Sequence, residues 1–316
     1  MRVDRTSLVP KRQRRPAGGA ARIAVIHIVF GVCLQICQPA SAGAQGRLSE
    51  QVVGDLSSHT VAAGETLSSI GARYGVNWQF LAAYNSLDDP NVVVPGQIIE
   101  VDNHHIVPLP PFETGVLINV PQRMLFYFVD GELFGAWPVA VGRTDWPTPT
   151  GSFEVRIREE DPTWNVPVSI QDEMRRLGQP VVTEIPPCPE NPLGAFWLGL
   201  GDQGIGIHGT NRPASIFSFQ THGCIRLHPD DIETLFPATP VGTPVRIIYQ
   251  PVLVARLSDG RLYLEAHEDI YGRDSDPGNG VPRPVDLTGI EDLQNIDREI
   301  IERILEEQAG IARRLD

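Results

Sequence analysis

The run of β-type segments between residues 115 and 250 constrains this 316-residue chain more than any other feature. "GVLINV" and "RMLFYFV" are rich in β-branched and aromatic residues, and Asp130-Gly131 between "LFYFV" and "ELFGAWPVAVG" predicts a hairpin turn. Helical patterns occur over 169–178 and 228–236, and they do not alternate with the strands. We therefore expect a mainly β fold, either an antiparallel β sandwich or a barrel-like sheet.

A smaller unit over residues 59–101 has the order strand, helix, helix, strand. Apolar residues recur at helical spacing from Leu67, with Thr66 as the natural N-cap and Gly75 as the stop. A second helical pattern covers 78–85, and "VPGQIIEV" then predicts a turn and a strand. This βααβ order in about 45 residues is near the lower limit for independent folding.

The first 42 residues are typical of an export signal. A basic lead-in precedes the apolar run 23–37, and the small residues of 39–44 suit cleavage after Ala42. The apolar run is short for a membrane span, which needs about 20 apolar residues. We therefore expect a signal peptide over 1–42, with an uncleaved anchor as the alternative.

Charge and cysteine content limit the function of what remains. Removing seven basic residues and one acidic residue with the signal changes the net charge from −13 to −19, which disfavours nucleic-acid binding. Of the four cysteines, Cys33 and Cys37 leave with the signal, whereas Cys188 and Cys224 remain. Two cysteines do not make a disulfide scaffold, so a free thiol in an oxidising compartment calls for a reason.

The segments between and after these units complete the domain plan. Residues 43–58 and the proline-rich 102–114 are interpreted as linkers. The extension 251–316 begins with a hairpin that turns at Asp259-Gly260. Its tail has apolar residues at mostly helical spacing, and we expect it to pack on the body or on a partner. These residues are Ile290, Leu293, Ile296, Ile300, Ile304 and Ile311.

The stretch "THGCIRLHP" (221–229) places a cysteine beside a histidine, and "GIHGTN" supplies His208 upstream. A histidine within hydrogen-bond reach of Cys224 could create the thiolate nucleophile. Gly223 permits a tight turn whose backbone N–H groups can face an oxyanion. One alternative is a zinc site from His208, His222 and Cys224, although their spacing matches no common zinc pattern. The other is a packed cysteine with incidental histidines.

Here the sequence resembles a known family. "IHGTNRPASIFSFQTHGCIRL" (207–227) is similar to the signature HG[TS]…[ST]HGC of YkuD-type L,D-transpeptidases. "VAVGRTDWPTPTGSFEV" (139–155) and "NPLGAFWLGL" (191–200) match further family segments in the same order. The resemblance covers about 115–250 and implies a mostly β catalytic domain that uses no metal or cofactor.

The resemblance also implies roles for individual residues. Cys224 matches the nucleophile and His208 the general base, while the backbone carbonyl of Gly209 helps to orient that base. His222 matches a supporting histidine, and Gly223 with Cys224 matches the oxyanion-hole backbone.

Three further positions are implied to bind substrate, namely Thr210, Thr221 and Arg226. Arg226 is expected to hold a substrate carboxylate or to shape the pocket, with a surface salt bridge as the alternative. Cys188 departs from the family pattern. If its loop covers the site, it could form a disulfide with Cys224, and a solvent-exposed bystander is the alternative.

The smaller unit resembles a LysM domain through "HTVAAGETLSSIGARYGV", "AYN" and "VVPGQIIEV". LysM domains bind polymers of N-acetylglucosamine, including peptidoglycan, and a small domain without a ligand is the alternative. The resemblance places the sugar against two loops. The residues implied are Gly64, Glu65, Thr66, Leu67, Val94 and Pro95.

The order of a LysM domain, a YkuD domain and a C-terminal extension resembles the periplasmic L,D-transpeptidases of Gram-negative bacteria. This implies acyl transfer from a tetrapeptide stem, with release of D-alanine, to diaminopimelate of another stem or to a lysine of an outer-membrane lipoprotein. The alternatives are an L,D-carboxypeptidase that uses water, and an inactive wall-binding protein. The chain after residue 42 lacks lysine, which fits an enzyme that activates acyl groups for lysine amines, with codon usage as the other explanation.

Overall fold

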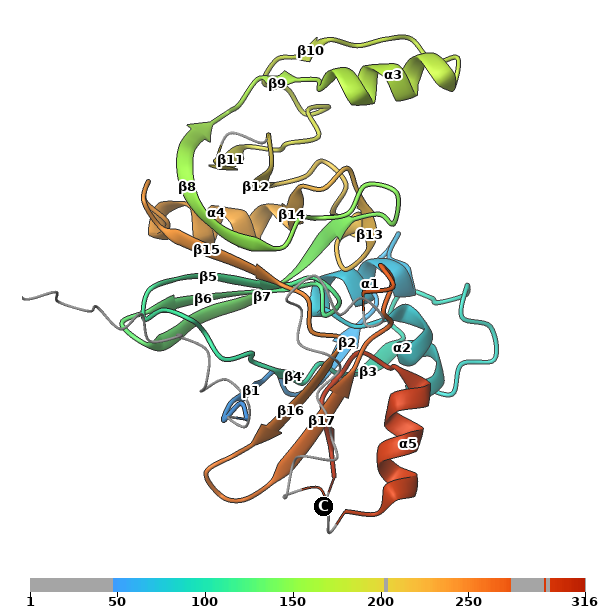
Figure 1. Ribbon diagram of the computed structural model, residues 1–316. Coiled ribbons are helices and arrows are strands. Elements are labelled where there is room, and N and C mark those ends of the chain that lie inside the picture. Colours follow the sequence, from blue (N-terminus) through green and yellow to red (C-terminus); the bar gives the residue numbers. More distant parts are fainter. Residues whose placement is uncertain (1–47, 202–203, 274–292, 294–295, 316) are drawn as a thin grey trace, which may run out of the picture. The chain divides into compact units, whose positions relative to one another are not determined.

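The computed structural model describes residues 48–201, 204–273, 293 and 296–315. The chain divides into two compact units, 1–44 and 45–316, and all described residues belong to the second. The predicted signal peptide lies outside the described residues. The described part is mainly β with five α-helices (Figure 1), as predicted, and none of these helices is both long and apolar enough to cross a membrane.

The βααβ unit consists of β2 (Leu56–Thr60), α1 (Leu67–Tyr74), α2 (Trp78–Tyr84) and β3 (Ile98–Asp102). β2 and β3 pair antiparallel. The start of α1 is fixed by a capping box, in which Thr66 Oγ1 accepts from the Ser69 N–H (3.1 Å) and Ser69 Oγ accepts from the Thr66 N–H (2.8 Å). Gly75, at φ 73°, ends the helix in the left-handed conformation. The predicted order of elements is confirmed.

The two segments predicted as linkers contribute strands where the structure describes them. β1 (Val52–Val53) pairs antiparallel with β4 (His105–Ile106), and β2 begins at Leu56. His105 and Ile106 are 1% and 0% exposed, so this part of 102–114 lies in the interior rather than on the surface.

The catalytic region is a nine-stranded sheet in the order β13-β7-β14-β12-β11-β8-β15-β5-β6. An additional pairing of β7 with β6 closes the sheet into a barrel. The strands are β5 (Gly115–Asn119), β6 (Met124–Val129), β7 (Glu132–Gly142), β8 (Gly151–Glu160), β11 (Phe196–Leu200), β12 (Gly206–His208), β13 (Phe219–Thr221), β14 (Ile225–Leu227) and β15 (Pro244–Ile248).

The barrel differs from the antiparallel expectation in three pairs. β12 with β14, β13 with β7, and β15 with β5 run parallel. A parallel neighbour needs a crossover of about a dozen or more residues. Between β12 and β14 that crossover is largely irregular, with the short helix η1 (Pro213–Ser215) and β13 within it, rather than an α-helix. The absence of βαβ alternation in the sequence therefore did not exclude parallel pairs.

The barrel core is formed by inward-facing residues of the strands together with one helix. α4 (Pro229–Ala238) contributes Ile232, Leu235 and Phe236 to this cluster. Pro229 occupies the first turn, and the His228 Nδ1 accepts from the Asp230 N–H at 3.3 Å. This helix follows β14 directly, so its packing helps to fix the strand that carries the predicted site.

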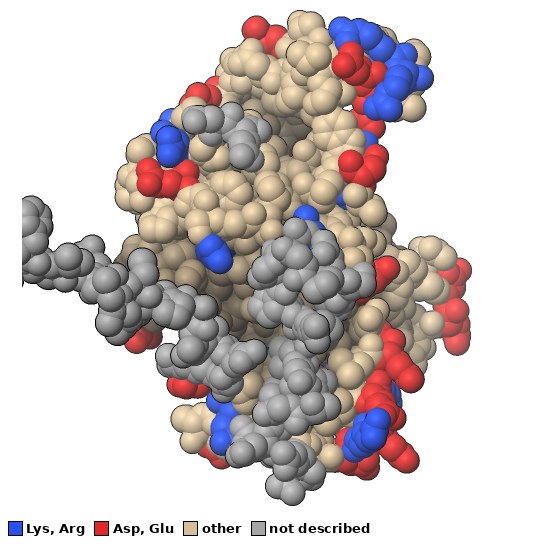
Figure 2. Space-filling model, viewed as in Figure 1, with Lys and Arg blue, Asp and Glu red and all other residues tan. Residues whose placement is uncertain are grey.

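Between β8 and β11 the chain makes an excursion that contains β9 (Trp164–Asn165), α3 (Val168–Arg176) and β10 (Glu184–Ile185). β9 and β10 pair antiparallel, and α3 has no buried residue. Figure 1 shows α3 at the top, beyond the strands of the barrel, and Figure 2 shows basic side chains gathered there, where α3 carries Arg175 and Arg176 in its last turn.

The C-terminal extension contains the predicted hairpin, β16 (Val252–Arg256) and β17 (Leu262–Ala266), with β18 (Arg313–Arg314) added beside β17. The tail helix α5 (Arg298–Glu307) is shorter than the apolar pattern predicts, because Gln308 adopts the left-handed conformation and ends it. Ile311 therefore lies outside the helix, and it packs, 1% exposed, in the core of the βααβ unit.

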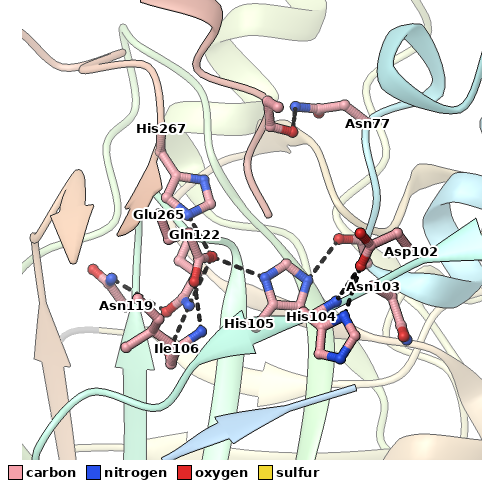
Figure 3. A network of polar contacts seen from close by, with 12 residues as sticks. Asn77, Asp102, Asn103, His104, His105, Ile106, Asn119, Gln122, Glu265 and His267 are labelled. Atoms are coloured by element: carbon pink, nitrogen blue, oxygen red, sulfur yellow. Dashed lines mark hydrogen bonds and ion pairs between the residues drawn. The ribbon is translucent and has the colours of Figure 1, made fainter. Parts of the chain in front are cut away.

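A buried carboxylate joins three parts of the fold (Figure 3). Glu265 of β17 is fully buried, with its Oε1 2.9 Å from His105 Nδ1 and 2.8 Å from His267 Nε2. The Gln122 amide donates to Glu265 Oε1 (3.0 Å), and the Ile106 N–H donates to Oε2 (2.5 Å). Burial opposes the charge, but the two histidines outweigh it and hold the pKa of Glu265 at about 2.

Candidate active site

The parallel strands β12 and β14 bring the predicted nucleophile and base to one face of the barrel wall. Their register pairs Ile207 with Ile225 and His208 with Arg226. Ile207 and Ile225 are buried in the barrel core. Because side chains alternate along strands, His208 and Arg226 face away from that core, and Cys224 directly precedes β14. The charge of Arg226 acts on both His208 and Cys224, in agreement with this placement.

His208 is held in one orientation by its own loop and by a neighbouring strand. Its Nδ1 lies 2.6 Å from the Gly209 carbonyl oxygen, and its ring stacks on Trp197 with 5.8 Å between centroids. Because a carbonyl only accepts, Nδ1 carries the proton of the neutral ring and Nε2 keeps its lone pair. Burial, reinforced by the charge of Arg226, lowers the pKa of His208 to about 3. The imidazole is therefore neutral at neutral pH, with an unprotonated Nε2.

Cys224 is a half-buried free thiol at the end of the turn that leads into β14. Its Sγ lies 3.8 Å from the Gly204 carbonyl oxygen. Burial raises the pKa of the Cys224 thiol, and the Gly206 backbone and Arg226 oppose that rise only in part. The raised pKa of the thiol and the lowered pKa of the imidazole both favour the neutral forms of these two groups.

Two threonine hydroxyls fix the turn before Cys224. Thr221 Oγ1 donates to the Cys224 carbonyl oxygen (2.6 Å) and accepts from the Gly223 N–H (3.2 Å). Thr148 Oγ1 donates to the Gly223 carbonyl oxygen (3.0 Å) and accepts from the Gly142 N–H (2.8 Å). Gly223 has φ +102°, which favours glycine. The Thr221 hydroxyl and the Gly223 N–H, predicted to face substrate, are engaged with each other here.

The His222 side chain contacts α3, in the segment between β8 and β11. Its Nε2 lies 2.6 Å from Glu173 Oε2, and the Trp146 ring meets it edge-on with 4.7 Å between centroids. The second oxygen of Glu173 accepts from Arg143 Nη2. His222 therefore belongs to a polar cluster with Glu173 and Arg143.

Arg226 and Thr210 lie on the other flank of the site. Arg226 Nη1 donates to Ser215 Oγ (2.8 Å), which in turn donates to the Arg212 carbonyl oxygen (2.6 Å). Thr210 is 5% exposed, and its Oγ1 accepts from the Arg212 N–H (2.9 Å). Burial lowers the pKa of Arg226, and the nearby Arg212 lowers it further. Two cationic side chains thus lie on this flank, a suitable environment for a carboxylate.

The predicted glycan-binding residues lie on or next to two loops. A hydrogen bond joins these loops, from the Gly96 N–H to the Val61 carbonyl oxygen (2.8 Å). Leu67 is 2% exposed and packs in the core of its unit, so its side chain does not face solvent. Glu65 is half-buried and lies 2.7 Å from His59 Nε2. The exposed members are Gly64, Thr66, Val94 and Pro95.

Sequence reasoning assigned no role to four residues that the structure places at the site. Thr148 and Trp146 lie within "VAVGRTDWPTPTGSFEV", so their motif could have pointed to them. Trp197 lies beside the "NPLG" segment. Glu173 lies on an amphipathic helix with nothing to distinguish it from the neighbouring charges.

Comparisons with known proteins bear on this site. The sequence model described as the L,D-transpeptidase catalytic domain, YkuD, matches residues 113–247, and that of the LysM domain matches 59–102. The putative L,D-transpeptidase YqjB of Bacillus subtilis is 37% identical over 43% of this chain and 72% of its own length. The putative L,D-transpeptidase YkuD of Bacillus licheniformis is 32% identical over 60% of this chain and 97% of its own.

This chain belongs to the YkuD family of L,D-transpeptidases. The probable L,D-transpeptidase YcfS of Escherichia coli is similar over a longer stretch, with 28% identity across 83% of this chain and 84% of its own length. The family supports an enzyme of this type, and the LysM match agrees with the predicted unit at the N-terminal side.

The two cysteines of the described part of this L,D-transpeptidase are both free thiols, Cys188 exposed and Cys224 half-buried. Within the described ranges, no three His, Cys, Asp or Glu side chains are placed to share a metal ion. His208 contacts Gly209 and Trp197, and His222 contacts Glu173 and Trp146, so the two histidines have separate surroundings.

The low pKa of His208 predicts acid sensitivity of this L,D-transpeptidase. The unfolded histidine takes up a proton near its ordinary pKa of 6.5, but the folded one does so only near 3. Stability from this group is therefore complete above pH 6.5 and falls as the pH decreases toward 3, by up to about 1.4 kcal/mol per pH unit.

Urea unfolding of wild type and His208→Gln between pH 7 and pH 4 measures this effect. We expect the free energy of unfolding to depend less steeply on pH in the variant. The other buried histidines remain in both proteins, so equal slopes would contradict the assignment.

Proposed function

We propose that this L,D-transpeptidase transfers the acyl group of a peptidoglycan stem tetrapeptide from D-alanine to an amine, through a thioester on Cys224. The proposal is based on the positions of one thiol and one imidazole. A free, half-buried thiol directly precedes β14, and a neutral, buried imidazole lies on its parallel partner β12, in a catalytic domain of this family.

In the first half-reaction, His208 Nε2 takes the proton of the Cys224 thiol as its sulfur attacks the carbonyl carbon between diaminopimelate and D-alanine. Proton transfer coupled to attack avoids a free thiolate–imidazolium pair, which the raised pKa of the thiol and the lowered pKa of the imidazole both disfavour. The tetrahedral intermediate collapses to the thioester, and His208 returns the proton to the amine of the departing D-alanine.

In the second half-reaction, an amine attacks the thioester and gives its proton to His208, and the released thiolate recovers a proton from the imidazolium. We assign the backbone N–H of Cys224, at the end of the turn fixed by Thr221 and Thr148, to the oxyanion in both halves. No external energy source is needed, because one amide bond is broken and one is formed over the two half-reactions.

The two arginines beside the site and the LysM domain both support a peptidoglycan stem as the substrate. Arg226 and Arg212 lie on one flank of the site, and stem peptides carry carboxylates. The LysM domain would hold the glycan strand through the exposed residues Gly64, Thr66, Val94 and Pro95. Peptidoglycan as the partner implies that the enzyme works in the periplasm, with the signal over 1–42 directing its export.

One incubation tests the reaction and identifies the acceptor. Residues 43–316 are mixed with a defined stem tetrapeptide and with either diaminopimelate-containing stems or a lysine peptide of a lipoprotein, and the products are read by mass spectrometry. Transfer should appear as a new amide with loss of D-alanine. Loss of D-alanine with uptake of water alone would instead establish an L,D-carboxypeptidase, and unchanged substrate would establish an inactive wall-binding protein.

The glycan-binding loop makes a separate prediction. Val94 is 55% exposed on the predicted loop, so Val94→Glu should weaken binding to sacculi on the order of tenfold, equivalent to about 1.4 kcal/mol. Val92, 58% exposed nearby, offers the matched control Val92→Glu. Sedimentation with purified sacculi measures binding, and turnover of a soluble stem should stay unchanged in both. Equal losses in the two variants would count against this loop as the binding surface.

A further inference from the structure

α3 is tied to the barrel through one carboxylate. Among the described residues, the hydrogen bonds and ion pairs from α3 to the body of the catalytic domain all come from Glu173. Its two oxygens bind His222 Nε2 (2.6 Å) and Arg143 Nη2. α3 buries none of its residues, so apolar packing does little to hold it in place.

Both partners of Glu173 belong to or contact the turn 221–224, called the catalytic turn below: His222 lies in it, and Arg143 is bonded to it. The Arg143 N–H donates to the Thr221 carbonyl oxygen (3.1 Å), and Arg143 lies over the Trp146 ring, with 5.6 Å from its guanidinium carbon to the ring centroid. Trp146 in turn meets His222 edge-on. The carboxylate is 19% exposed and is paired on both oxygens, and the pKa of Glu173 is held below its usual range by His222 and Arg143.

We propose that Glu173 is a positioning residue, which latches α3 beside the catalytic turn and fixes the orientation of His222, so that the acyl-enzyme is protected from water. The inference rests on the proposed thioester chemistry but adds a residue outside the family signature. Glu173 reaches the chemistry through His222 and does not itself touch the thiol.

The hydrogen-bond geometry defines what the latch does to His222. A carboxylate only accepts, so the Nε2 of His222 carries the proton and the imidazole cannot rotate without breaking a charge-assisted hydrogen bond. Loss of the carboxylate would free the ring and the helix together. A thioester that awaits an amine is hydrolysed when water reaches it, so a loosened α3 should favour water over the amine.

The test compares Glu173→Ala and Glu173→Gln with Asp172→Asn in residues 43–316. Asp172 is the neighbouring carboxylate on α3, 58% exposed and paired with Arg175 of the same helix. The readouts are kcat/KM with a stem tetrapeptide and the ratio of hydrolysed to transferred product at fixed amine concentration. The ratio does not depend on how much enzyme is correctly folded.

We expect Glu173→Ala to lower kcat/KM by on the order of 10-fold to 100-fold, as when a carboxylate that orients a functional histidine is removed. The hydrolysed fraction should rise several-fold. Glu173→Gln should lie between this variant and wild type, because it can still accept from His222 but loses the charge. Asp172→Asn should match wild type. An unchanged product ratio in Glu173→Ala, or the same change in Asp172→Asn, would overturn the proposal.

A second measurement is independent of turnover. Hydrogen exchange of the α3 amides should be faster in Glu173→Ala than in wild type and Asp172→Asn, because the latch is gone. A wild-type enzyme that forms no thioester would refute the proposed function, whereas equal exchange in all proteins would refute the latch.

Discussion

Replacing Cys224 by alanine should abolish thioester formation and product release, with a loss of at least ~10⁴-fold in kcat, as when a catalytic nucleophile is removed. The reason is that the thiol is the atom that carries the acyl group, and no neighbouring group can replace it. His208, with its pKa near 3, would remain an intact base with nothing to deprotonate. Mass spectrometry of the protein after incubation with the stem measures the missing acyl adduct.

Two controls separate chemistry from binding. Cys224→Ala should sediment with sacculi as wild type does, because the predicted glycan loops belong to the LysM domain. Cys188→Ala removes the other described cysteine, which is exposed and free, and should keep full activity. Turnover by Cys224→Ala at the wild-type rate would eliminate the thioester mechanism.

The second large effect concerns stability. Glu265→Ala should lower the free energy of unfolding by about 3–5 kcal/mol, the range for breaking a buried ion pair by removing one partner. The change leaves His105, His267 and Gln122 buried without the oxygen that they share. Urea denaturation at pH 7 measures the loss.

The matched control is Glu302→Ala, which removes an exposed carboxylate paired with Arg298 one turn away and should cost about 0.5 kcal/mol or less. The charge of Glu265 also sets a pH dependence. Because its pKa falls from 4.5 to about 2 on folding, its contribution is complete above pH 4.5 and disappears as the pH falls through 2. If the two variants were equally stable, the buried network would carry no net stabilisation.

Local signals made much of the fold predictable. Thr66 and Gly75 cap α1 as their residue types indicate, and Asp130 and Gly131 both adopt positive φ in the predicted hairpin turn. These features depend on a few neighbouring residues, which is why propensity and spacing revealed them.

The features that sequence reasoning missed depend on residues far apart in the chain. Glu173 and His222 are 49 positions apart, and His105 and Glu265 are 160 apart. Parallel pairing of β12 with β14 likewise depends on an irregular crossover. A carboxylate in such a pair has no local pattern, so only the folded chain distinguishes Glu173 from Asp172.

The position of Ile311 has a consequence for the order of assembly. During synthesis the LysM residues emerge long before residue 311, yet the interior of that domain includes this isoleucine. The next residue also bonds to an earlier part of the chain, because the Ala312 N–H donates to the His104 carbonyl oxygen at 2.7 Å. The LysM domain therefore reaches its final packing only after the barrel has been translated, so a chain that ends before residue 311 would lack part of that domain's core.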